Sequence, residues 1–119
     1  MPLSDAGKNV ALDALGAVAV YFSLHSADPG SSGTSELSGG SPAYARQQGS
    51  WDPASGGSMS IGGSETFNVP AGATVAYFGI WSASTGGTFY GGGALSASEN
   101  FQEQGTYTLT DAEITLTDA

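Results

Sequence analysis

The chain has 119 residues, a length that suits one domain with a modest core. Two basic residues, Lys8 and Arg46, stand against eleven acidic ones, giving a formal net charge of −9. This balance excludes nucleic acid and an anionic membrane surface as partners, because both need a cluster of cations. The absence of cysteine excludes disulfides, zinc–thiolate sites and cysteine nucleophiles.

The first predicted element is a short helix over residues 5–15. Ser4 is a suitable N-cap, Asp5 favours the helix dipole, and Gly16 is a natural residue to end the helix. A helix this short is unstable alone, so one apolar face is predicted to pack against the rest of the protein. That face comprises Ala6, Val10 and Ala14 with Ala11 and Leu15 beside them, while Lys8, Asn9 and Asp13 are expected to look outward.

From Ala17 the hydrophobic period becomes two, which predicts a strand through His25 with one buried face. The turn sequence Asp28-Pro29-Gly30 ends this strand. Residues 28–42 are rich in Gly and Ser, have no periodicity and predict an extended loop. We expect Ser31 to Pro42 to be exposed in the isolated subunit and to be ordered mainly by contacts in an assembly.

Short strands are predicted over residues 44–51, 58–61, 64–69, 74–82, 88–95, 106–110 and 113–117. Gly62-Gly63 is a hairpin signal, residues 74–82 are apolar on both faces and should be central, and the glycine run 91–93 indicates a bulge or a close backbone approach. About seven or eight strands with frequent turns predict a mainly β fold. We expect residues 1–119 to form a single antiparallel β-sandwich with one short N-terminal helix.

The histidine His25 and the acidic residue Asp28 form an H-x-x-D pattern beside the loop. Such a pair suits a general base with its orienting carboxylate, but no well-motivated nucleophile accompanies it. We favour a locally hydrogen-bonded histidine followed by an Asp-Pro-Gly turn. The carboxylates lack the alternating spacing of a calcium loop, and no glycine-rich phosphate loop is present. We therefore predict no catalytic residues, no metal, no cofactor and no enzymatic activity.

Consecutive aromatic pairs occur at residues 21–22, 77–78 and 89–90, and the members of each pair must point to opposite faces of a strand. One member enters the core, and the other faces a sugar surface or is covered by the helix or a neighbouring subunit. We favour cover by the helix or a subunit. The candidate assembly surface comprises Tyr21, His25, Tyr44, Arg46, Trp51, Tyr77 and Tyr90.

Three segments of the chain carry a family resemblance: SLHSADPG, GGSPAYAR and VAYFGIWSASTGGTFYGGG. With these segments the chain resembles, over nearly its whole length, small virion proteins of tailed bacteriophages, especially of phages that infect actinobacteria. Such proteins are described as minor tail, tail-fibre-like or decoration proteins. The resemblance implies a structural, non-enzymatic role and supplies no catalytic residues.

We therefore expect a multi-copy accessory subunit on the outer surface of a phage particle, as head decoration or as a minor tail or fibre-type component. The expected partners are identical subunits and other virion proteins of the capsid or tail, and the negative charge disfavours a DNA-filled interior. The N-terminal residues lack a signal-peptide pattern, which predicts assembly in the host cytoplasm. The alternative is a carbohydrate-binding module that recognises a host surface glycan.

Overall fold

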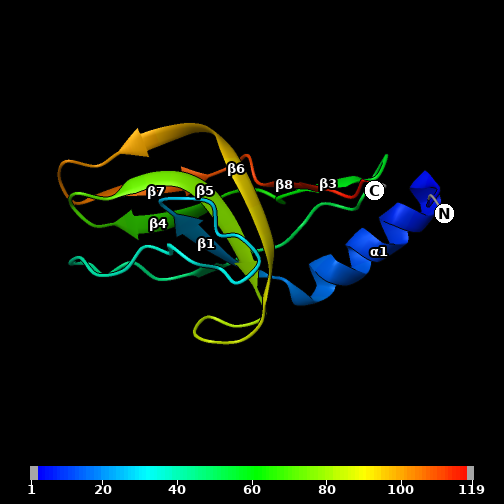
Figure 1. Ribbon diagram of the computed structural model, residues 1–119, viewed down its shortest axis with the longest axis horizontal. Helices are drawn as coiled ribbons and strands as arrows, with labels where there is room; N and C mark the ends of the chain where they lie inside the picture. Colours follow the sequence, from blue (N-terminus) through cyan, green and yellow to red (C-terminus); the bar gives the residue numbers. More distant parts are fainter. Residues whose placement is uncertain (1–2, 118–119) are drawn as a thin grey trace.

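A computed structural model describes residues 3–117, which form an elongated molecule of 47 × 25 × 22 Å with the helix projecting from one end (Figure 1). No helix in this part of the chain is long and apolar enough to cross a bilayer. The elements of the described residues are α1 (Asp5–Val18), β1 (Tyr21–His25), β2 (Gln47–Gln48), β3 (Ser58–Ser60), β4 (Glu65–Val69), β5 (Thr74–Trp81), β6 (Phe89–Asn100), β7 (Gly105–Leu109) and β8 (Glu113–Thr115).

All of the strand pairs are antiparallel, so the predicted mainly β class is confirmed. Four strands form one sheet in the order β2-β1-β5-β6, and two further ladders pair β3 with β8 and β4 with β7. The strand β5 is central between β1 and β6, as its apolar sequence predicted. The predicted strand over residues 44–51 is reduced to the two residues of β2.

The core lies between the four-stranded sheet and the β4–β7 ladder, which form the two layers of the sandwich. It is made of aromatic and branched side chains that are at most 1 % exposed, because each strand presents alternate residues to it. The sheet contributes Phe22, Leu24, Val75, Phe78 and Ile80, and the ladder contributes Phe67, Val69 and Leu109. Packing in this core fixes the register of β1 and β5. The register in turn determines which residues lie on the opposite face of the two strands.

The hairpin predicted at Gly62-Gly63 is wrong, because the two flanking strands do not pair with each other. β3 pairs with β8 and β4 pairs with β7, so the glycines carry the chain from one ladder to the next. The backbone N–H of Gly62 donates to the carbonyl of Ser50, and that of Ile61 donates to Ala112. The strands β7 and β8 near the C-terminus are thus the pairing partners of β4 and β3, which were expected to pair with each other across a local turn.

The glycine run in β6 confirms the predicted close backbone approach. A Cβ at Gly92 would collide with the carbonyl oxygen of Phe78 on β5. The register between the two strands also shifts between Ile80 and Trp81, where Tyr90 is the extra, bulged residue. The run therefore lets β6 lie against β5 where any side chain would separate them.

The helix is longer than predicted: it begins at Asp5 but continues through Gly16 to Val18. Ser4 caps it as expected, with its Oγ accepting from the N–H of Gly7 at 3.1 Å. Gly16 keeps helical backbone and serves packing instead, since a Cβ there would lie 3.2 Å from Cδ1 of Trp51. The glycine that suggested a helix end is thus one of the points at which the helix contacts the body.

Candidate interaction surfaces

The strand β1 is buried on both faces, so the prediction of a single buried face is wrong. Phe22 and Leu24 face the core, whereas Ser23 and His25 point to the other side and are also 0 % exposed. Residues 29–37, which we name the arm, fold back over this second side. The sequence concealed this arrangement because the covering segment is a Gly- and Ser-rich loop without periodicity.

The chain's own contacts hold the arm in place, which corrects the expectation that an assembly orders it. The N–H of Leu37 donates to the carbonyl of Leu24 at 3.0 Å, and Leu37 is itself buried. The backbone at Gly33 lies so close to Trp81 that a Cβ there would meet Cζ2 of the indole at 2.5 Å. Most other residues from Ser31 to Pro42 are exposed, as expected.

Beneath the arm, His25 lies in a continuous chain of hydrogen bonds. The Nε1–H of Trp81 donates to Oγ of Ser23 at 2.8 Å, and Ser23 Oγ is 2.7 Å from Nε2 of His25. Nδ1 of His25 is 2.7 Å from the carbonyl oxygen of Thr34. Because a carbonyl only accepts, Nδ1 carries the proton and the serine hydroxyl donates to Nε2. Burial lowers the pKa of His25, so the ring is neutral at neutral pH.

This geometry replaces the H-x-x-D interpretation, because both ring nitrogens of His25 already have partners other than Asp28. The carboxylate of Asp28 accepts from the N–H of Gly30 at 2.8 Å, as in an Asp-Pro-Gly turn. The locally hydrogen-bonded histidine that we favoured is therefore confirmed. The Ser23–His25 pair suggests a nucleophile and its base, but both residues are 0 % exposed and offer no surface to a substrate.

Beside the histidine, Arg46 ties the arm to the loop between β5 and β6. Its Nε and Nη2 each donate to Glu36 at 3.0 Å, and its Nη1 donates to the carbonyls of Ala83 and Gly86. The guanidinium also lies 3.6 Å from the centroid of the Trp81 ring, a cation–π contact. The Arg46 side chain is only 9 % exposed, so its charge serves the fold more than the surface.

Glu36 also accepts from the hydroxyl of Tyr44 at 2.8 Å, and that hydroxyl accepts from the N–H of Leu24 at 3.0 Å. Burial raises the pKa of Tyr44 far above its usual range, which keeps the phenol protonated as a donor. We name the connected set the arm network. It comprises Ser23, His25, Glu36, Tyr44, Arg46 and Trp81.

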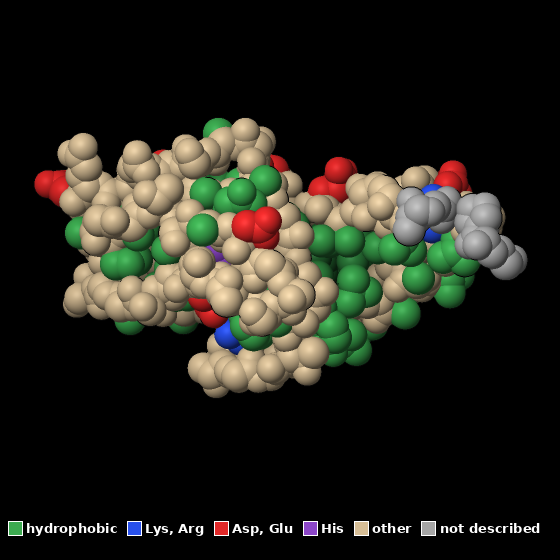
Figure 2. Space-filling view, in the orientation of Figure 1, with side chains coloured by type: hydrophobic (Ala, Val, Ile, Leu, Met, Phe, Trp, Pro, Cys, Tyr) green, Lys and Arg blue, Asp and Glu red, His purple; other side chains and the backbone are tan. Residues whose placement is uncertain are grey.

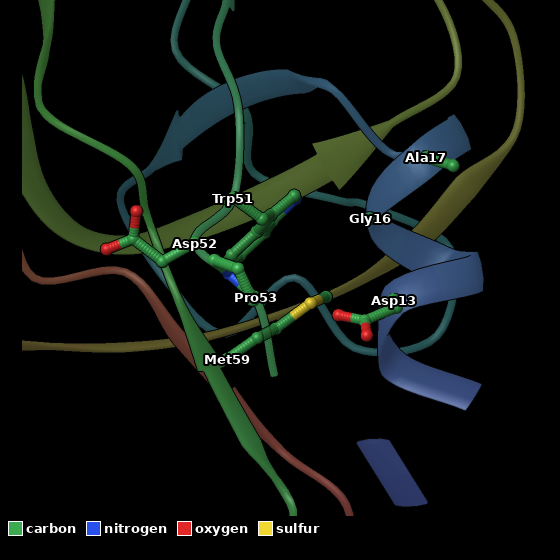
Figure 3. A pocket seen from close by; sticks show the side chains of 7 residues that line it. All are labelled: Asp13, Gly16, Ala17, Trp51, Asp52, Pro53 and Met59. Atoms are coloured by element: carbon green, nitrogen blue, oxygen red, sulfur yellow. The ribbon is translucent and has the colours of Figure 1, made fainter. Parts of the chain in front are cut away.

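A second region lies where α1 meets the body, and Figure 3 shows it from close by. A pocket of about 350 Å³, which we name the foot pocket, is lined by Asp13, Gly16, Ala17, Trp51, Asp52, Pro53 and Met59. Trp51 packs on Phe22 with ring centroids 5.1 Å apart, and its Nε1–H donates to the carbonyl of Ala19 at 2.9 Å. The pocket therefore has an apolar floor held rigidly by the core.

The helix turns a different face to the body than the one predicted. Leu12 is 2 % exposed and Leu15 packs against the core, with Asn9 bonded to the N–H of Gly57. Val10, on the opposite side, is 71 % exposed. The face that was expected to be buried is thus uncovered, apart from Leu15. Both sides of the helix are apolar, so periodicity alone allowed either side to face the body. The side that does so carries the larger leucines.

The candidate surface residues do not form one surface. His25 is fully buried, and Tyr44 and Arg46 belong to the arm network. Tyr21 and Tyr77 lie on the arm side of the sheet, since Tyr77 is paired with His25 and Tyr21 with Trp81. The ring of Trp51 lies on the other side, against Phe22. Tyr90 is the most exposed of the predicted aromatics, at 40 %.

Sequence reasoning missed Ser23, Glu36 and Trp81, on which the arm network depends. A signal was available for Glu36, because it is the one acidic residue within the otherwise uncharged segment 29–45. Its nearest cation along the chain is Arg46, ten residues away. In the part of the chain that the structure describes, no three His, Asp or Glu side chains are grouped to hold a metal ion.

Comparison with known proteins gives one clear result. A family model described as "Podophage GP4 fiber I protein gp80" matches residues 6–117, which is nearly the whole chain. The matched range includes the arm network, the foot pocket and most of α1. A search of curated proteins finds no match.

Proposed function

We propose, because the chain belongs to the family of the podophage GP4 fiber I protein gp80, that it is a fibre-type accessory subunit on the outer surface of a phage particle. Membership makes the chain a phage tail-fibre-like structural protein, and the match over residues 6–117 is the observation that carries the proposal. The outer position and the preference for a fibre over head decoration are the proposed part. We also propose that the mature location is the virion, after assembly in the host cytoplasm.

The acidity of the chain supports an outer position. A net charge of −9 with two basic residues would repel packaged DNA, and Arg46 is already paired with Glu36. Proteins and solvent at the particle surface do not impose this cost. The partners that we propose are therefore other virion proteins and identical subunits, with no nucleic acid and no membrane.

The burial pattern supports a non-enzymatic role and a single structural unit. The one Ser–His pair of the arm network is sealed by the arm, as described above. One cluster of buried side chains runs from Ala19 through Phe78 to Ala112 and so joins both layers of the sandwich. We infer that residues 1–119 act as one domain.

Labelling of virions tests the outer position. Antibodies raised against the purified chain should bind intact particles, and gold-labelled antibodies should collect at the fibre-bearing end in electron micrographs. Particles from a phage that lacks the gene provide the matched control. Label that is spread evenly over the head, or that binds only after particles are disrupted, would overturn the fibre position or the outer position respectively.

Glycan binding is a second candidate, and one observation favours it. A pocket of about 310 Å³ opens between the arm end and the β5–β6 loop, with Tyr44, Arg46 and Thr85 among its lining residues. A tyrosine and polar groups in one concavity suit a sugar, although most N–H groups of Arg46 are already used within the chain. A glycan array probed with the wild-type chain and with Thr85→Trp, which fills the pocket, tests this candidate. Unchanged binding in the variant would remove the pocket from consideration.

A further inference from the structure

The outward side of α1, together with the residue before its N-cap, carries an exposed apolar stripe. We name Leu3, Ala6, Val10, Ala14 and Ala17 the helix stripe; all five are exposed, with Val10 at 71 % and Leu3 at 48 %. Figure 2 shows hydrophobic side chains gathered over the helix and its junction with the body. In a chain of net charge −9, a face without a central charge is where two copies meet with least repulsion.

The order of residues in the helix stripe is symmetric about Val10. Ala6 and Ala14 lie four residues to either side of it, and Leu3 and Ala17 lie seven residues to either side. A two-fold axis through Val10, with the helices antiparallel, therefore sets Val10 on Val10 and each Ala6 on an Ala14. Self-complementarity of this kind is what an isologous interface requires. The small alanines allow the two helices to approach closely around the valines.

The ends of the stripe are complementary as well. Leu3 precedes the N-cap Ser4 and lies beside the first turn, where its Cδ2 is 3.7 Å from the position of a Cβ on Gly7. The same axis brings this first turn of one copy to the last turn of the other, where Ala17 lies at the rim of the foot pocket. The pocket of about 350 Å³ has Trp51 and Met59 as its apolar floor, and Gly16 adds no side chain between the helix and that floor (Figure 3). The exposed leucine of each copy thus meets a hollow of the other that has an apolar floor, with Asp13 and Asp52 also in its lining.

Charge distinguishes this arrangement from a parallel one. In the antiparallel pair Asp13, at the rim of the stripe, lies level with Gly7 in the first turn of the neighbouring helix. Its Oδ1 accepts from the N–H of Ala54 at 2.9 Å within its own chain, and the carboxylate as a whole would lie near the positive end of the neighbouring helix dipole. A parallel bundle would instead bring the Asp13 carboxylates of all copies together at the same level, which like charges disfavour.

We propose that α1 pairs antiparallel with α1 of a second copy about a two-fold axis at Val10, with Leu3 of each copy entering the foot pocket of the other. This inference deepens the proposed function, on which it rests for the presence of several copies. A helix of fourteen residues is about 21 Å long, so the pair buries less than the roughly 1,200 Å² of a stable interface. The dimer therefore forms at micromolar or higher concentrations.

Sedimentation of the purified full chain from about 5 to 500 μM measures this association, the upper range being where weak interfaces populate. The wild-type chain should pass from monomer to dimer. Val10→Asp should raise the dissociation constant about 30-fold or more, because it places unpaired carboxylates at the apolar centre. Ala11→Asp adds the same charge on the same helix but off the stripe, and should leave the constant within about threefold. A wild-type chain that stays monomeric, or equal effects of the two variants, would overturn the proposal.

Disulfide capture tests the direction of the pair, since the wild-type chain has no cysteine. Leu3→Cys and Ala17→Cys chains are mixed under mild oxidation, with circular dichroism confirming that each is folded. The antiparallel pair predicts that mixed disulfides between the two variants predominate. A predominance of disulfides between identical Leu3→Cys chains would establish a parallel arrangement and refute this one.

The two proposals fail separately. A chain that is a monomer in both tests but labels the outside of virions would leave the proposed function intact and remove only the dimer. A chain that forms the mixed disulfide but is absent from purified virions would do the reverse.

Discussion

The arm network and the helix stripe differ in the kind of side chain that is buried. The arm network buries polar groups, whereas the helix stripe leaves apolar groups exposed. Under the arm, polar and charged groups are buried, yet every buried side-chain nitrogen and oxygen of the described residues has a partner. On α1, apolar groups such as Val10 are left exposed although the body lies beside them. Burying a polar group without a hydrogen-bond partner costs free energy, and over the described residues this chain supplies all of those partners itself. It leaves exposed an apolar face of the kind that a second chain can cover.

The largest expected effect comes from filling the space beneath the arm. Gly79→Ala places a Cβ 2.5 Å from Oγ of Ser23 and 2.6 Å from Nε2 of His25. Both atoms are held by hydrogen bonds, so we expect the free energy of unfolding to fall by about 3 kcal/mol. Gly93→Ala is the matched control, because its Cβ would meet only the Phe78 ring at 3.3 Å. Chemical denaturation of both variants checks this, and equal losses would contradict a rigid arm network.

A smaller loss is expected where Arg46 joins the arm to the β5–β6 loop. Arg46→Lys keeps the charge but has no planar fork for both Glu36 oxygens and the two loop carbonyls. We expect a loss of about 1–2 kcal/mol in the free energy of unfolding. A double-mutant cycle with Glu36→Gln separates the loss at Glu36 from the loss at the loop carbonyls. If the coupling is near zero, the two-pronged geometry toward Glu36 contributes nothing beyond charge, and the loop carbonyls account for the loss.

The histidine gives a smaller effect that depends on pH. The pKa of His25 is lowered in the folded chain, so the unfolded chain takes up the proton first. The free energy of unfolding should therefore fall as the pH drops through about 6.5 and stop falling below the folded-state pKa. His25→Gln keeps a donor and an acceptor without titrating, and its stability should be flatter from pH 7 to 5. The same slope in both chains would show that other groups cause it.

The contrast also explains which parts of the fold the sequence predicted. The central position of β5 and the close approach at Gly92 could be predicted from local composition. The effect of an apolar run or of a glycine depends on the residues at that position and not on a distant segment. The N-cap at Ser4 is equally local. The pairing partners of β3 and β4 could not be predicted from local composition. Their partners β8 and β7 lie more than thirty-five residues away, and the sequence equally allows a hairpin between neighbouring strands.

The candidate sites were harder to predict than the strands. His25 was expected at a surface, but its environment is set by Thr34 of the arm, whose carbonyl contacts Nδ1, and by Trp81 of β5, which donates to the Ser23 hydroxyl beside it. The seven predicted surface residues were chosen by residue type, and type does not reveal which side of β1 a loop will cover. The helix face was ambiguous for a simpler reason, since Leu12 and Val10 both offered an apolar side.

The smallest expected effect sharpens the comparison most, because the two variants that it compares lie on the same helix. Val10→Ala should change the free energy of unfolding of the dilute monomer by less than about 0.5 kcal/mol, as at other exposed positions. Leu12→Ala, two residues away and 2 % exposed, should cost about 2–3 kcal/mol. Thermal unfolding at low and high protein concentration extends the test, since a face that serves only a second copy matters only when that copy is bound. A large effect of Val10→Ala in the dilute monomer would place this face in the fold of a single chain, and the contrast between the two regions would then disappear.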